Sequence, residues 1–262
     1  MPETRDPAAP GRLLLAVSSA WTGNGVRRIL ATLVEGQDLA VDALFVEDLD
    51  LLHLAALPFT REVGRTSGIS RAILTDDVER ALQSAARQME RDLRRLAVEH
   101  RFVCTFETRR GRFDAEVRRK APAVDVVLVP PRRAPASPAT SAPHVPPQVI
   151  VRIETETPAG ERALRLAAAL ARSDRSRLVV VVPDPSRQAT ATALGWVRAR
   201  LPSAAMPVRV VIESDANPAP LAALAGAGRH DVVVLPSAGA SPQDGSLDAA
   251  LDTLPCTAVL VR

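Results

Sequence analysis

A short apolar segment occurs once in each half of this chain. Residues 124–130 read VDVVLVP and residues 230–236 read HDVVVLP. Aliphatic and β-branched runs that stop at a proline are typical of buried strands. Each copy also follows an earlier apolar run, at residues 13–17 in the first half and 149–153 in the second. The chain therefore contains an internal repeat, and we expect two related halves.

The second half alternates apolar runs with segments of helical period. We expect strands at residues 178–182, 208–212 and 257–261, in addition to the two apolar runs of that half, and helices at 161–172, 188–201, 218–227 and 247–252. Strands that alternate with helices predict right-handed crossovers and a parallel sheet. The fold class is therefore α/β.

The first half follows the same order but contains an insertion, residues 48–74, after the strand expected at residues 43–46. The insertion begins with a leucine-rich stretch that is apolar enough to form a helix lying on the domain or against a partner. A long helix is expected from Thr75 to His100, because Asp76 and Asp77 suit its positive N-terminal end.

Prolines mark the domain boundaries. We predict a disordered leader at residues 1–11, a first domain at 12–131, a proline-rich linker at 132–147 and a second domain at 148–262. The linker cannot support a helix or a strand. It occupies the place where the first half should form its last helix and strand, so we expect the first copy to be truncated.

Charge and composition exclude several classes of partner. The formal net charge is only +3, from 33 basic and 30 acidic residues, and neither half carries a basic excess. This balance argues against nucleic-acid binding. No apolar run reaches the roughly 18 residues that span a membrane. Cys104 and Cys256 lie in different halves, which favours a reduced, cytoplasmic protein without a disulfide framework or metal site.

The second half resembles the universal stress protein family from Val149 to Arg262. The run 149–155 followed by 158–164 looks like that family's first strand, acidic turn and first helix, and LPCTAVLV at 254–261 looks like its closing passage. Residues 12–131 resemble the same family more faintly. The resemblance implies two tandem Rossmann-like domains with five-stranded parallel sheets of order 3-2-1-4-5, the first copy truncated.

The resemblance also indicates where a nucleotide would bind. ATP-binding members carry glycines after the fourth strand, because bare backbone N–H groups close around phosphate oxygens. Here that position begins with Pro236, and the first half has Pro130 and Pro131 instead. Ser18 replaces the family's acidic residue in the first half. The candidate nucleotide-binding residues in the second half are Glu154, Val182, Pro236, Gly239, Gly245 and Ser246.

Other motifs carry no catalytic chemistry. Residues 23–28 read GNGVRR, where Arg28 replaces the third glycine of a dinucleotide-binding turn, so an ordinary helix start is favoured. The four histidines lack zinc-ligand spacing, and no nucleophile elbow or Walker loop occurs. We therefore expect no catalytic residues and no metal.

Two functions from different classes remain open. The first is a non-enzymatic stress-response or regulatory protein that acts through protein contacts, either a protein partner or a homodimer. It would use the insertion 48–74 or the edge of the truncated first sheet, which must be covered. The alternative is an ATP-binding switch or weak ATPase in the second domain. The degenerate loops favour the first function, with no cofactor expected and ATP doubtful.

Overall fold

The computed structural model describes residues 11–18, 24–36, 39–64, 67–131, 147–153, 157–183, 187–201, 208–213, 231–237, 254 and 256–262. The predicted leader and linker fall almost entirely outside these ranges. So do the helices expected at 218–227 and 247–252. The described residues form an α/β fold built on one large, mostly parallel sheet, as the alternating sequence pattern predicted.

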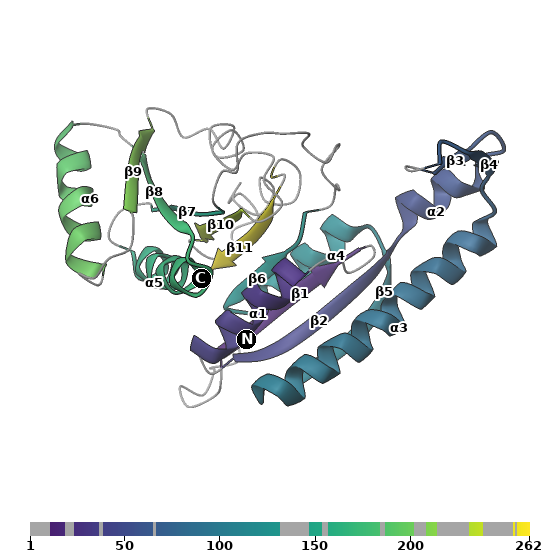
Figure 1. Ribbon diagram of the computed structural model, residues 1–262, viewed down its shortest axis with the longest axis horizontal. Coiled ribbons are helices and arrows are strands. Elements are labelled where there is room, and N and C mark those ends of the chain that lie inside the picture. Colours follow the sequence, from purple (N-terminus) through teal and green to yellow (C-terminus); the bar gives the residue numbers. More distant parts are fainter. Residues whose placement is uncertain are drawn as a thin grey trace.

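In the described part of the chain, nine strands form this sheet (Figure 1). In spatial order they are β5 (Cys104–Gly111), β2 (Leu39–Asp48), β1 (Gly11–Val17), β6 (Val126–Val129), β11 (Thr257–Val261), β10 (Val232–Pro236), β7 (Gln148–Arg152), β8 (Arg177–Pro183) and β9 (Val208–Glu213). Every neighbouring pair is parallel except β6 and β11, which are antiparallel.

The two halves contribute unequal parts of the sheet. The second half runs β9-β8-β7-β10-β11, so that its strands lie in the order 3-2-1-4-5 when numbered along the chain. The first half contributes β5-β2-β1-β6, which is 3-2-1-4 in the same numbering. The expectation of two separate sheets is wrong, because the halves share one continuous sheet.

Strand β11 joins the halves. It pairs with β10 on one side and with β6 on the other, where Val259 lies opposite Leu128. The backbone N–H of Arg262 then donates to the Asp125 carbonyl at 2.9 Å. The last strand of the second half thus covers the edge beside β6, as the expectation that this edge must be covered requires. That edge is therefore not available to a partner, which corrects the prediction that a partner could use it.

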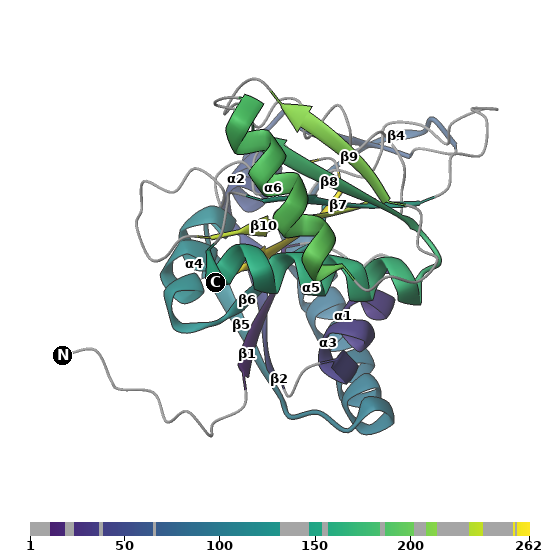
Figure 2. The ribbon, with the colours of Figure 1, turned by 90° about the vertical axis from the view of Figure 1, so that its left-hand side faces the viewer.

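Helices cover both faces of the sheet. Leu13 and Leu15 lie on one face of the sheet, in a buried cluster that also includes residues of α1 (Asn24–Gly36), α3 (Thr75–His100), α5 (Pro158–Ser173) and α6 (Arg187–Arg200). Leu14 and Ala16 point to the opposite face, where α4 (Phe113–Lys120) and the 3₁₀ turn Ala121–Ala123 pack. Figure 2 shows the first-half strands between α4 on one side and α1 with α3 on the other.

The repeated aspartates have the same structural role in both halves. The Asp125 carboxylate, just before β6, accepts from the backbone N–H of Arg12 at 2.7 Å. Asp231, just before β10, accepts from the backbone N–H of Gln148 at 3.0 Å. Each aspartate thus ties the start of its half's fourth strand to the start of the first. The sequence repeat reflects this shared packing.

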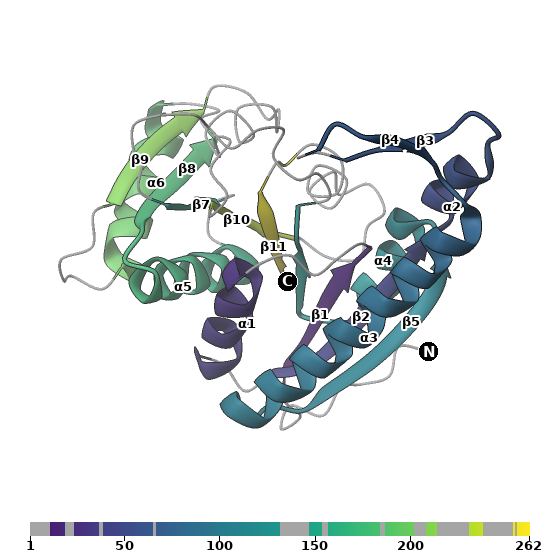
Figure 3. The same ribbon diagram turned by 45° about the vertical axis from the view of Figure 1, so that its right-hand side comes forward.

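The insertion 48–74 forms an arm. Helix α2 (Leu49–Ala56) begins at Asp48, whose carboxylate accepts from the backbone N–H of Asp50 at 3.0 Å. A hairpin follows, in which β3 (Arg61–Val63) pairs with β4 (Ser70–Ala72) outside the main sheet. Figures 1 and 3 show the arm beyond the end of β2, beside the N-terminus of α3. The predicted helix therefore forms, and the hairpin was not anticipated.

Candidate functional site

The carboxyl ends of β7, β8 and β10 lie side by side in the second half. The chain proceeds from β7 to β8 on one side, while β10 lies on the other side of β7. In open α/β sheets, ligands bind outside the strand ends at such a reversal. This edge is therefore the place where a nucleotide would bind.

Two of the six predicted contacts lie at this edge within the described residues. Pro236 ends β10 and pairs with Val261, and it is half-buried. Val182 lies in β8 opposite Ile212, and its side chain is fully buried in the core. Val182 therefore has a packing role. The other four residues fall outside the described part of the chain: Glu154, Gly239, Gly245 and Ser246.

The backbone just after β10 does not offer phosphate donors at its first two positions. Pro236 has no N–H group. The backbone N–H of the next residue, Ser237, donates to the carbonyl of Val261 at 2.7 Å. A phosphate-binding loop needs several backbone N–H groups that point at the anion. Such a loop could begin only beyond Ser237.

The corresponding edge of the first half is built differently. Pro130 and Pro131 follow β6, so neither residue donates a backbone N–H there. Two strands away from β6, β2 ends at Asp48, which caps the arm helix, and Glu47 accepts from the Arg110 guanidinium at 3.1 Å. Arg110 also contacts Glu79 at 3.1 Å, and the pKa of Arg110 is raised by Glu47 first and then by Glu79. These groups tie β2, β5 and α3 together.

The face of β5 and α4 carries further ion pairs. Glu107 contacts both Lys120 and Arg109. The hydrogen bond from Lys120 is the main cause that lowers the pKa of Glu107. Charged side chains on an edge strand such as β5 discourage pairing with other chains. We read this network as protection of the sheet edge.

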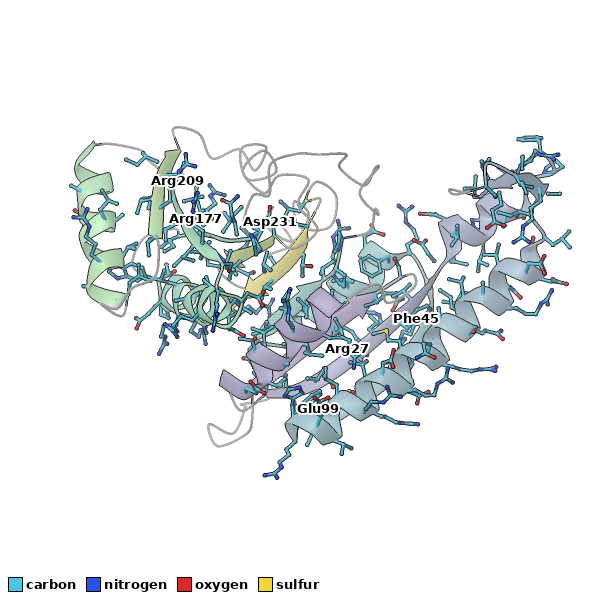
Figure 4. The ribbon with its side chains drawn as sticks, viewed as in Figure 1. Arg27, Phe45, Glu99, Arg177, Arg209 and Asp231 are labelled. Atoms are coloured by element: carbon cyan, nitrogen blue, oxygen red, sulfur yellow. The ribbon has the colours of Figure 1, made fainter. Side chains whose placement is uncertain are left out.

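One carboxyl group and two thiols have raised pKa values, and all three lie away from the carboxyl ends of the strands. Burial raises the pKa of Asp231 to about 6, although the hydrogen bond from Gln148 opposes the shift. Asp231 precedes β10, so it lies at the amino end of the strands (Figure 4). Burial also raises the pKa of Cys104 to about 11 and that of Cys256 to about 12. Neither thiol is activated as a nucleophile, because reactivity needs the thiolate.

Within the described ranges there is no group of three or more side chains suited to hold a metal ion. No described helix is long and apolar enough to cross a membrane.

The arm carries an exposed apolar surface. Phe59 is 79% exposed and Ile69 is 68% exposed. Five more large hydrophobic side chains of the arm are exposed: Leu51, Leu54, Leu57, Val63 and Leu74. The hairpin residues of β3 and β4 are all exposed. The sequence contained a signal for this hairpin, because Gly64 and Gly68 separate two short runs and Gly68 adopts a φ of 66°.

Several solved structures are similar to this chain, and two of them align over nearly its whole length. No family model matches the chain, and no curated protein matches it. A universal stress protein from Archaeoglobus fulgidus DSM 4304 aligns over 95% of this chain and 96% of its own, with 12% identity and a TM-score of 0.49. The cytoplasmic domain of a prokaryotic cation chloride cotransporter aligns over 96% and 95%, with 13% identity and a TM-score of 0.45.

Proposed function

We propose that this protein is a non-enzymatic binding module of the universal-stress type, which acts in stress response or regulation through protein contacts made by the arm, residues 48–74. One observation carries the proposal. Among the described residues, eleven large hydrophobic side chains are exposed, and seven of them lie between Leu51 and Leu74. Single exposed hydrophobic residues are common, but a gathered set marks an interaction surface.

The construction of the arm supports this role. A two-stranded hairpin is marginally stable by itself in water. Here Arg61 donates to Ser70 at 2.8 Å and Arg71 pairs with Glu62 at 2.6 Å, so the cross-strand pairs hold the register. The polar pairs fix the shape while the apolar side chains remain exposed. A partner that buries Phe59 and Ile69 would add the apolar contact that the hairpin lacks.

A photo-crosslinking amino acid placed at position 59 tests the proposal in cells. We expect a discrete adduct with another protein, and its yield should fall when Leu54→Ser and Ile69→Ser are added, because these changes remove the neighbouring apolar contacts. An adduct of twice the chain mass would identify a second copy as the partner. The same crosslinker at Arg162, an exposed residue of α5, is the matched control. Equal adducts from both positions, or none from position 59, would contradict the proposal.

A nucleotide-dependent switch or weak ATPase is the second candidate. It is favoured by the arrangement around β7, where β8 lies on one side and β10 on the other. Open α/β sheets bind ligands at the carboxyl ends of strands where the strand order reverses in this way. Two residues argue against nucleotide binding: Pro236 has no backbone N–H, and the N–H of Ser237 already donates to the carbonyl of Val261. In a calorimetric titration of the purified protein with ATP, we expect no micromolar binding. A micromolar dissociation constant would instead support a nucleotide-dependent switch as the function of this protein. We also propose a cytoplasmic location, which suits the two cysteines because both are free thiols.

A further inference from the structure

Helix α3 carries a line of arginines on its outer face. Arg80, Arg87, Arg91 and Arg95 follow each other at separations of seven, four and four residues, and Arg94 lies beside them; all five are exposed. At 3.6 residues per turn these separations place the side chains on one stripe about 22 Å long. We call these five residues the arginine ridge. In Figure 4, nitrogen-tipped side chains extend from this helix away from the sheet.

The opposite face of α3 is fixed in the core, so the ridge must face outward. Five residues of the helix are buried against the sheet and its neighbours: Leu82, Ala86, Met89, Leu93 and Leu96. The outward orientation is therefore determined by packing, and it does not depend on the charges. Figures 1 and 3 show α3 along the outer side of the first half.

Part of the ridge charge is not neutralised within the described residues. Arg80 pairs with Asp77, and Arg94 pairs with Glu90 at 2.7 Å. Arg91 donates to the amide oxygen of Gln88 at 2.6 Å, which leaves its charge in place. No carboxylate among the described residues pairs with Arg87 or Arg95. Three guanidinium charges thus point toward solvent along the middle of the helix.

Acidic residues flank the ridge on both sides. Glu79 and Glu90 are eleven residues apart, which is close to three turns, so they share one side of the helix. Asp92 and Glu99 are seven residues apart and share the other side. Glu79, Glu90 and Asp92 are half-buried, as expected for positions between the outer face and the core. Glu79 pairs with Arg110 and Glu90 pairs with Arg94, so their charges are neutralised. The helix therefore presents a positive centre line beside one negative border, formed by Asp92 and Glu99.

We propose that the arginine ridge binds a helical segment of another protein whose acidic side chains form a stripe with basic residues along one side. Charge complementarity carries this assignment. A uniformly negative partner, such as duplex DNA or an anionic membrane, would meet the carboxylates of Asp92 and Glu99 along one border and be repelled there. The ridge also has no aromatic side chain for base stacking. A second copy of the ridge would repel the first.

Exposed ion pairs are individually weak and are screened by salt. The contribution of the ridge to affinity is therefore largest at low salt, and the ridge also raises the encounter rate. This inference does not depend on the arm, since none of the five arginines belongs to residues 48–74. It remains testable whether or not the arm binds a partner.

The test uses a fluorescent synthetic helix of about six turns, with Glu on one stripe and Lys along one side of that stripe. A second peptide has the same composition with the Glu and Lys positions scrambled. At low salt we expect the striped peptide to bind about tenfold more tightly than the scrambled one. The triple variant Arg87→Gln, Arg91→Gln, Arg95→Gln should bind the striped peptide about tenfold more weakly, which corresponds to about 1.4 kcal/mol.

The matched control removes three exposed arginines from another helix: Arg162→Gln, Arg165→Gln and Arg172→Gln in α5. This variant should bind as the wild type does, and circular dichroism checks that both variants stay folded. Equal affinity for the two peptides would overturn the proposal, and so would equal loss in the two triple variants. Tighter ridge-dependent binding of duplex DNA or of phosphatidylserine vesicles would also overturn it.

Discussion

A Val259→Pro variant is expected to lose about 3–5 kcal/mol of stability in both halves of the protein, not only in the half that contains the residue. Val259 is fully buried in β11, and it pairs with Val234 on one side and with Leu128 on the other. Proline donates no ladder hydrogen bond, and a buried group left unpaired costs roughly 1–3 kcal/mol. Losing the buried valine side chain adds about 2 kcal/mol.

The matched control is Val208→Pro. Val208 is the first described residue of β9, which lies at the end of the sheet order, and its side chain is 38% exposed. Proline is tolerated at the first residue of a strand and on edge strands. Urea unfolding followed by far-ultraviolet circular dichroism should show a large drop in midpoint for Val259→Pro and a small one for Val208→Pro. Similar losses in the two variants would contradict a special role for β11.

The second large effect concerns the buried carboxyl of Asp231. Its pKa is raised from 3.8 to about 6 in the folded protein. Between these two values the unfolded chain releases its proton while the folded chain keeps it, so the stability contributed by this group falls as pH rises. Above pH 6 the cost levels off at about 3 kcal/mol, from 1.36 kcal/mol per unit of pKa.

Asp231→Asn isolates this contribution. The asparagine carbonyl can still accept from the Gln148 backbone, but it carries no charge. The variant should match the wild type near pH 4 and gain stability relative to it up to about pH 6, reaching a surplus of up to about 3 kcal/mol. Urea unfolding of both proteins from pH 4 to 7.5 measures the difference, in which other titrating groups cancel. A constant difference, or a less stable variant at pH 7.5, would show that the charge is not the cause.

The sequence predicted a helix or strand correctly where the hydrophobic period of the segment agreed with the residues at its ends. Helix α3 was expected at residues 75–100 and forms there. Its apolar spacing of three and four residues admits only one buried face. The strands β1, β6, β7, β10 and β11 coincide with short aliphatic runs, because both faces of a central parallel strand are buried.

The joining of the halves was not predictable from the same signals. An aliphatic run predicts a buried strand but does not specify its neighbour. Val126–Val129 and Thr257–Val261 are separated by most of the second half, and nothing in either run indicates that they pair. The sequence did indicate that the first half lacked an ending, and hence that its edge had to be covered. The structure shows that β11 covers it.

The candidate sites also combine features that a single residue determines with features that depend on the whole fold. Pro236 signalled a weak phosphate loop because proline lacks an N–H group, which is a property of the residue itself. The engagement of the Ser237 N–H depends on the position of Val261, so only the structure shows it. The leucines after Asp48 predicted an apolar insertion, yet their exposure depends on where the arm lies. The arginine ridge became visible only once the buried face of α3 was known.

The central claim is that the two halves form one cooperative structure through β11, with the arm outside it. The chain has two tryptophans, Trp21 in the first half and Trp196 in the second. Trp196→Phe leaves a fluorescent reporter in the first half, and Trp21→Phe leaves one in the second. Urea unfolding of the two variants should give coincident normalised transitions, as a single cooperative unit requires. Two transitions with separate midpoints would contradict the account.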